Sequence, residues 1–318
     1  MARHRAGISV PIPVLLLPVD RFFLLFNIIV AAAFASLALF EPRAWAFAGV
    51  HLIALGVPLL LARCDLRAPA WLRAIRQLYP VGFLPLYWIE LGLRHTLLGG
   101  RSQDALVASV ELWIFGLQPS LAWHHAMPNP WLDGFLYAAY AAYYPLLIGV
   151  PSLVLASREQ PAVRELVLRL TVTYLGCFLC YTVFPVLGPR EFFPATHWLS
   201  HSIFARFSEA MRATGDSLGT AFPSSHVAGS ITLAWIAWRR CSRPLAWVST
   251  LVAGGVAFAV VYTGNHFVLD SVSATALAVA LQRWIDFREA DPVLYRESAT
   301  DVSGASEPEP QVLPGIAA

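Results

Sequence analysis

The chain has 318 residues, of which 57% are hydrophobic and 13% charged, and its formal net charge is +2. Soluble domains carry about 25% charged residues, so this composition excludes a solvated, disordered or nucleic-acid-binding protein. It indicates a polytopic membrane protein, because about 20 apolar residues cross a bilayer as a helix and the chain has room for several such runs. The chain contains no lysine, which excludes a lysine Schiff base and a P-loop.

The apolar runs predict eight membrane-spanning helices. In chain order they cover 22–40, 44–62, 79–98, 131–156, 166–187, 223–238, 244–263 and 266–285. Residues 105–126 are expected to form a half-buried, re-entrant or interfacial segment, where protein or water satisfies the backbone. The pattern predicts an all-α fold, a polytopic membrane helix bundle in which two N-terminal transmembrane helices precede a six-helix core.

Arginines gather in the segments that eight spans place on one side of the membrane. These segments are the N-terminus, 63–78, 157–165, 239–243 and the flank from residue 283. Positive residues favour the cytoplasmic side, so both termini are expected there, and the remaining loops are expected to face outward. The tail from residue 290 onward is rich in Glu, Ser and Pro and is expected to be disordered.

One polar motif, Pro223-Ser224-Ser225-His226, opens the sixth predicted span on the outward side. Proline and serine favour a helix start, which leaves backbone N–H groups and the positive end of the helix dipole near His226. Such a helix start binds phosphate well. A plain helix cap with an interfacial histidine is the alternative.

A second motif contains His266 and Asp270, which are four residues apart and therefore share one helix face. A carboxylate one turn away can accept a proton from one imidazole nitrogen. That contact fixes the tautomer and makes the other nitrogen a better nucleophile or base. The alternative is a His–Asp pair that only packs.

The third motif, Gly188-Pro189-Arg190, follows the fifth predicted span. Arg190 could offer a planar, bidentate guanidinium to phosphate, or its side chain could simply snorkel to the membrane surface. The three motifs share one face of the membrane in the predicted topology. Together they contain the residue types of a phosphoryl-transfer site without metal ligands or a nucleotide loop, so no metal and no cofactor is expected.

Other polar residues have two interpretations each. Asp104 and Glu111 are seven residues apart, so they could share a helix face and bind a substrate head group, or only cap a helix and pair with arginines. Tyr137, Tyr140 and Tyr144 lie at helical spacing near an interface. This spacing favours an aromatic belt or a packing stripe over a ligand site.

The motif that ends at His226 and the His266-x-x-x-Asp270 pair resemble the second and third motifs of the type 2 phosphatidic acid phosphatase superfamily. The segment 104–120 and the turn at 188–190 are more similar to the subgroup of fungal inositol phosphorylceramide synthases and their bacterial relatives. The resemblance implies a phosphatase-like catalytic membrane domain over 79–286. A two-helix membrane segment at 1–78 precedes it, and a disordered cytoplasmic tail at 287–318 follows it.

The resemblance also implies a mechanism. His266 would attack phosphorus and become a phosphohistidine, with Asp270 orienting it and stabilising its charge. His226 would protonate the leaving oxygen, and Ser224 and the backbone N–H of Ser225 would hold phosphate oxygens. Water would then release phosphate, or a lipid hydroxyl would accept the phosphoryl-linked group, such as a phosphoinositol head group.

This chain departs from the family's pattern at three points. Ser225 stands where the second motif usually has glycine, Val260 stands where the third motif usually has arginine, and the first motif's lysine has no counterpart. Arg190 would therefore carry more of the phosphate charge. Arg94 and Arg101 are candidate helpers, and Arg101 is also a candidate head-group contact.

The leading interpretation is thus an integral-membrane lipid phosphatase or phosphotransferase whose partners are a membrane lipid substrate and the bilayer, with no nucleic acid. A non-catalytic lipid transporter or scaffold with the same fold is the alternative. A vanadate-dependent peroxidase shares the residue types, but the hydrophobic spans argue against it. The lipid substrate, the acceptor and the oligomeric state stay open.

Overall fold

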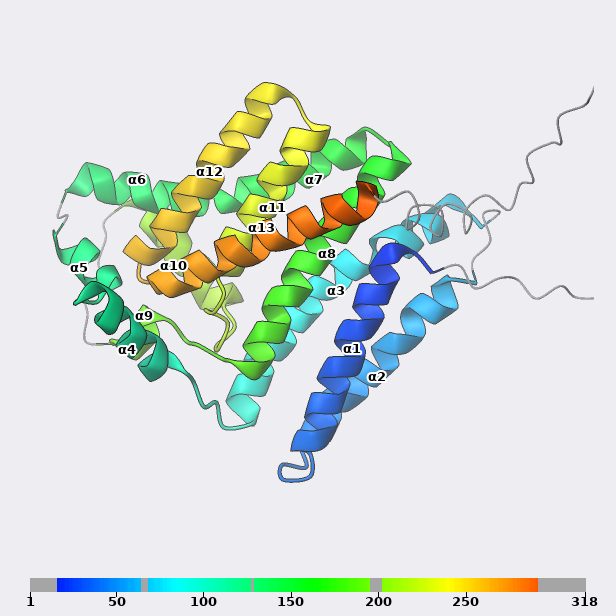
Figure 1. Cartoon of the computed structure of the whole chain (residues 1–318), viewed down its shortest axis with the longest axis horizontal. Helices are drawn as coiled ribbons and strands as arrows, with labels where there is room; N and C mark the ends of the chain where they lie inside the picture. The colour runs from blue at the N-terminus through cyan, green and yellow to red at the C-terminus, as the bar shows by residue number, and fades with distance from the viewer. Residues whose placement is uncertain (1–15, 64–67, 127–128, 195–201, 291–318) are drawn as a thin grey trace, which may run out of the picture.

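The computed structural model describes residues 16–63, 68–126, 129–194 and 202–290, and within these ranges the chain is helical, without a β-strand (Figure 1). The helices are α1 (Pro18–Leu37), α2 (Ala44–Leu61), α3 (Ala70–Leu97), α4 (Asp104–Phe115), α5 (Pro119–Ala126), α6 (Pro130–Ala141), α7 (Tyr143–Ala156), α8 (Gln160–Val183), α9 (Pro189–Phe192), α10 (Ile203–Gly215), α11 (Ser225–Arg240), α12 (Arg243–Tyr262) and α13 (Val268–Ala290).

Five helical segments of the described residues are long and apolar enough to cross a membrane. They are α1, α2, the α6–α7 pair taken as Pro130–Ala156, α8 and α12. These segments correspond to five of the eight predicted spans, and the predicted all-α polytopic bundle is confirmed as the fold class. The other three predicted spans are α3, α11 and α13. Helix α11 has only 16 residues, and α3 and α13 are long enough but are not apolar enough to count among the candidate spans, so the count of eight stays a prediction.

The first two helices form a hairpin that packs against α8 and α3. A buried polar contact holds this hairpin to the start of α3: Asp20 of α1 accepts hydrogen bonds from Arg76 and from the hydroxyl of Tyr79, the latter at 2.7 Å. Because the apolar surroundings raise the cost of an unpaired charge, this contact fixes the register of α1 against α3. The domain boundary predicted at residue 78 falls inside α3 and remains a prediction.

Helix α8 runs through the middle of the bundle, with α11, α13 and α7 on one side and α1 and α3 on the other (Figure 1). Most of its residues are buried, as expected of a helix with neighbours on several sides. Helices α11 and α13 pack against α8 and each other, and α12 packs beside α11. This arrangement brings the N-terminal ends of α11 and α13 together, and these ends carry the two histidine motifs.

A charged network closes the opposite end of the same helices. The fully buried Arg169 of α8 contacts Glu165 at 2.8 Å, Asp286 at 2.6 Å and Glu289 at 3.2 Å. At this end the rings of Phe22 and Trp284 lie 5.5 Å apart, so the start of α1 and the last turns of α13 are side by side. The first residues of the predicted disordered tail, 287–290, belong to α13, and the rest of the tail, 291–318, lies outside the described residues.

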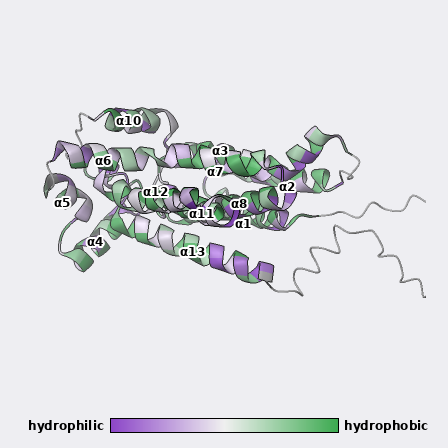
Figure 2. Cartoon of the chain, turned by 90° about the horizontal axis from the view of Figure 1, so that it is seen from above, coloured by the Kyte–Doolittle hydropathy of each residue, from purple (hydrophilic) through white to green (hydrophobic). Residues whose placement is uncertain are grey.

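The segment predicted to be re-entrant or interfacial forms two short helices, α4 and α5, of 12 and 8 residues. Gly116 separates them with a left-handed backbone (φ +69°), a conformation that costs little for glycine. Helix α10 lies outside the main bundle, against α6 (Figure 2). Helices α4, α9 and α10 thus surround the end of the bundle that holds the histidine motifs (Figure 1).

Candidate active site

Two histidines meet where α11 and α13 begin. His226 lies in the first turn of α11, and His266 lies in the turn just before α13. Their ring centroids are 6.0 Å apart, with the ring planes inclined by 61°. The two helix starts are also joined through the backbone, since the N–H of Ser224 donates to the carbonyl of Asp270 at 3.1 Å. The structure therefore brings together two motifs that are forty residues apart.

The tautomer of His266 follows from its contacts. Its Nδ1 lies 3.0 Å from the carbonyl oxygen of Ala221 and 3.5 Å from Oδ2 of Asp270. A carbonyl oxygen can only accept, so Nδ1 carries the proton. In the neutral imidazole Nε2 is then the unprotonated nitrogen, and its lone pair is free to act as a nucleophile.

Asp270 is fully buried and anchors the start of α13. Its Oδ2 accepts the backbone N–H of Phe267 at 2.8 Å, which is half of a capping box and satisfies one of the free donors at the helix start. Its Oδ1 is buried and has no hydrogen-bond partner in the described part of the chain. The carboxylate therefore serves both the helix and the histidine one turn away.

Three tyrosines surround the ring of His226. The ring centroids of Tyr140, Tyr143 and Tyr144 lie 5.3, 4.6 and 6.3 Å from it, and the hydroxyl of Tyr140 is 3.3 Å from Nε2. The sequence pattern favoured a membrane belt or a packing stripe for Tyr140 and Tyr144. Tyr140 ends up on α6 and Tyr144 on α7, and the packing of α7 against α11 and of α6 against α12 places both rings beside the histidine.

The two serines of the first motif are buried at the start of α11. Ser224 is the N-cap residue, and its side chain accepts from the N–H of Val227 at 3.4 Å. The N–H of Ser225 donates to the hydroxyl of Tyr181 at 3.1 Å, and that hydroxyl donates to the carbonyl of Pro223 at 2.7 Å. Phosphate binding through Ser225 would therefore require Tyr181 to release this N–H. Sequence reasoning did not identify Tyr181.

Arg190 is tied to the turn that carries His266. Its Nε donates to the carbonyl of Thr263 at 2.7 Å, and its backbone N–H donates to the carbonyl of Gly264 at 3.0 Å. Its other guanidinium nitrogens contact Glu209 of α10 and the hydroxyl of Tyr137, each at 2.9 Å. The Gly188-Pro189-Arg190 motif thus lies beside the motif of His266. Glu209, which the sequence did not mark, and Tyr137, for which the sequence pattern favoured a belt or packing role, both contact Arg190.

Gly188 allows this turn to approach so closely. Its φ is +100°, and a Cβ atom at this position would lie 2.5 Å from the carbonyl oxygen of Asn265. Any side chain would push the turn away from the loop that precedes α13. Asp104 holds the same turn, because its carboxylate accepts the N–H groups of Leu187 and Gly188 at 2.8 to 3.1 Å.

Glu111 of α4 caps α13 from outside, since its Oε1 accepts the N–H of Leu269 at 3.0 Å. Burial raises the pKa of Glu111 to about 7, with Asp270 adding to the effect and the Leu269 N–H opposing it. The contacts of Asp104 and Glu111 correspond to the capping alternative, and a head-group role stays a prediction. Arg101 is exposed between α3 and α4.

The position where the family usually has arginine lies in the core. Val260 is fully buried, and its carbonyl oxygen accepts the backbone N–H of His266 at 3.0 Å. Arg94, a candidate helper, is also buried and donates to the carbonyl of Tyr181 at 2.8 Å. Arg94 thus supports Tyr181, which contacts the start of α11.

A comparison with protein families finds that the model described as PAP2 superfamily matches residues 106–284, which is more than half of the chain. The chain belongs to the PAP2 superfamily. The match includes both histidine motifs and Arg190 but begins just after Asp104. This membership supports a phosphatase-type enzyme. No curated protein and no solved structure shows a significant match.

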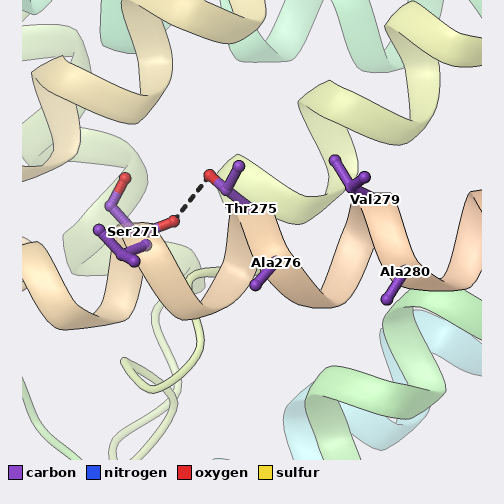
Figure 3. A pocket seen from close by; sticks show the side chains of 6 residues that line it. Ser271, Thr275, Ala276, Val279 and Ala280 are labelled. Atoms are coloured by element: carbon purple, nitrogen blue, oxygen red, sulfur yellow. Dashed lines mark hydrogen bonds between the residues drawn. The ribbon is translucent and has the colours of Figure 1, made fainter.

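The PAP2 core carries two open grooves beside the candidate site. One, of about 550 Å³, runs along α13 and is lined by Ser271, Val272, Thr275, Ala276, Val279 and Ala280 (Figure 3). The other, of about 320 Å³, lies between α5, α12 and α13 and shares Ser271 and Val272 with the first. Both grooves are mainly apolar and include α13 residues next to Asp270 in the sequence, but His226, His266 and Asp270 do not line them.

Proposed function

We propose that this PAP2 protein is an integral-membrane phosphatase or phosphotransferase that acts on lipid phosphate esters through a phosphohistidine at His266. The observation that carries the proposal is the contact of His266 Nδ1 with a carbonyl oxygen and with Asp270, beside a second histidine. This set provides a nucleophile, a group that stabilises its positive charge, and an acid for the leaving oxygen.

The proposed reaction has two steps. In the first, Nε2 of His266 bonds to phosphorus, the bond from phosphorus to the lipid oxygen breaks, and that oxygen takes a proton from His226. In the second, water or a lipid hydroxyl gives its proton to His226 and attacks phosphorus, and the N–P bond breaks. Ser224 and Arg190 would stabilise the charge on the phosphate oxygens, as positioned donors do in phosphoryl transfer.

A lipid substrate agrees with the surroundings of the site. The apolar grooves along α13 include residues next to Asp270 in the sequence, and they are suited to hold an acyl chain while the phosphate lies at the histidines. Transfer of a phosphoinositol-type head group is the finer form of the proposal, and the resemblance to inositol phosphorylceramide synthases supports it. Hydrolysis and transfer differ only in whether water or a lipid hydroxyl reaches the phosphohistidine.

We also propose that the termini are cytoplasmic and that the active site faces the extracytoplasmic side. The arginine-rich segments support this orientation. Arg239 and Arg240 end α11, whereas His226 begins it, so the histidines and these arginines lie at opposite ends of one helix.

The test is an assay of the purified full chain with short-chain phosphatidic acid and phosphatidylinositol, with and without ceramide or diacylglycerol. We expect His266→Ala to abolish turnover and to form no acid-labile phosphoenzyme. His226→Ala is expected to form this phosphoenzyme, but slowly. Free phosphate in wild type alone would indicate hydrolysis, and a new head-group lipid made only with acceptor would indicate transfer. Turnover in His266→Ala equal to that of wild type would refute the proposal and favour a transporter or scaffold.

A further inference from the structure

The two ring nitrogens of His226 have different environments. Nε2 lies 3.3 Å from the hydroxyl of Tyr140, whereas Nδ1 is buried and has no hydrogen-bond partner among the described residues. A buried polar atom without a hydrogen-bond partner costs free energy, unless a ligand supplies the missing partner. Nδ1 is therefore the nitrogen that remains for the substrate, and Nε2 is the nitrogen that the protein holds.

The Tyr140 hydroxyl can serve both protonation states of this ring. It is buried on α6 and hydrogen-bonded to the hydroxyl of Tyr144 on α7. A phenol is both donor and acceptor, so it can accept Nε2–H from the imidazolium while donating its own proton to Tyr144. After Nδ1 gives up its proton, Nε2–H still has the same acceptor. No side chain needs to move between the two states.

We propose that Tyr140 is a positioning residue for the general acid of this enzyme: it holds Nε2 of His226 so that Nδ1 delivers the proton to the leaving oxygen. The inference rests on the proposed function. In the step, the proton passes from Nδ1 to the lipid oxygen as the P–O bond breaks, the His226 ring becomes neutral, and Tyr140 keeps its own proton.

Tyr143 provides a matched control. Its ring is closer to His226 than that of Tyr140, with centroids 4.6 Å apart, but its hydroxyl is hydrogen-bonded to the hydroxyl of Tyr174 at 2.7 Å. Tyr140→Phe and Tyr143→Phe each remove one buried hydroxyl and keep the aromatic contact. Only the first removes the partner of Nε2.

The experiment compares these variants on two substrates that differ in their need for an acid. The leaving oxygen of a short-chain phosphatidic acid must be protonated, whereas 4-nitrophenyl phosphate releases a stable phenolate. General acids contribute about 10²–10⁴-fold, and loss of their positioning is expected to cost a part of this. We expect Tyr140→Phe to lower kcat/KM on the lipid by about tenfold and to leave kcat/KM on the nitrophenyl ester within about twofold. The ratio kcat/KM reports formation of the phosphohistidine and not its breakdown, in which His226 acts for both substrates.

The controls separate the outcomes. Tyr143→Phe is expected to match wild type on both substrates, and Tyr144→Phe to show a smaller loss on the lipid alone. Equal losses of Tyr140→Phe on both substrates would indicate a purely structural role and overturn the inference, as would full activity on the lipid. His266→Ala, run in parallel, tests the proposed function by itself: turnover in that variant would reject the phosphohistidine whatever Tyr140→Phe does.

Discussion

At the scale of single residues, Arg190 already holds a carboxylate where the substrate phosphate is proposed to bind. Its Nη1 contacts Glu209, a half-exposed residue of α10, at 2.9 Å. Contacts with Arg212 and Arg190 lower the pKa of Glu209, so it is ionised at neutral pH. A phosphate that reaches Arg190 must therefore compete with Glu209 for the guanidinium.

Replacing Glu209 with glutamine is expected to lower KM for lipid phosphates. The neutral amide competes less with phosphate, and an exposed ion pair is worth about 0.2–1 kcal/mol, which corresponds to at most about a fivefold change in KM. The measurement is steady-state kinetics of the purified chain. Glu191→Gln is the control, because Glu191 contacts Arg212 instead, at 2.9 Å. A KM that stays the same in Glu209→Gln would show that Glu209 does not compete for Arg190.

At the scale of elements, the start of α13 depends on a short helix outside the five candidate spans. Glu111 of α4 caps it at Leu269, and Asp270 caps it at Phe267. Two carboxyl groups thus meet at one helix start. The positive end of the helix dipole favours a negative charge there, but burial opposes the ionisation of a second carboxyl group.

This arrangement predicts a pH dependence of stability. The pKa of Glu111 rises from 4.5 in the unfolded chain to about 7 in the folded one, so the folded state binds this proton more tightly. Its contribution to stability is complete below the unfolded pKa and decreases as pH rises toward about 7. Glu111→Gln keeps an oxygen for the Leu269 N–H but cannot ionise.

Thermal unfolding in detergent at about pH 5 and about pH 8 checks this expectation. Wild type should lose more stability than Glu111→Gln between the two values. The same loss in both proteins would mean that Glu111 does not take up a proton on folding.

At the scale of the whole molecule, the helices join two ends with different chemistry. The N-terminal ends of α11 and α13 carry the histidines, whereas the charged network around Arg169 lies at the far end. The interior between them is mainly apolar and includes a buried hydrogen-bonded cluster of Thr173, Thr232 and Gln282. We therefore expect stability and catalysis to respond separately to changes at the two ends.

Arg169→Met tests this separation. It removes the buried cation shared by Glu165, Asp286 and Glu289, which keep the partly exposed Arg239. Breaking a buried ion pair completely costs about 3–5 kcal/mol, so a loss at the lower end of this range is expected. We expect a large drop in the unfolding temperature in detergent with kcat per folded molecule unchanged. Arg243→Met is the control, since Arg243 only stacks on Trp238 at 5.2 Å and should cost about 0.5–1 kcal/mol. A matching loss of kcat in Arg169→Met would show that the two ends are coupled.

Short-range information in the sequence predicted the helices of the apolar runs and named the candidate catalytic residues, but it left α9 and α10 in an outward loop. Apolar runs of span length predict helices wherever they occur, because a bilayer demands internally satisfied backbone. The serine at 224 indicated the start of α11, and the four-residue spacing placed His266 and Asp270 on one face. These features depend only on neighbours within a few positions, so the amino-acid order alone determines them.

The partners of the candidate catalytic groups were decided only by the tertiary structure. His266 is oriented by the carbonyl of Ala221, and His226 is held by Tyr140, 86 residues away in the chain. Every residue has a carbonyl, and a tyrosine at helical spacing also suits a packing stripe, so neither is marked in the sequence. Which of them reaches a histidine depends on how α6, α11 and α13 pack, because helix packing sets contacts between residues that are far apart in the chain.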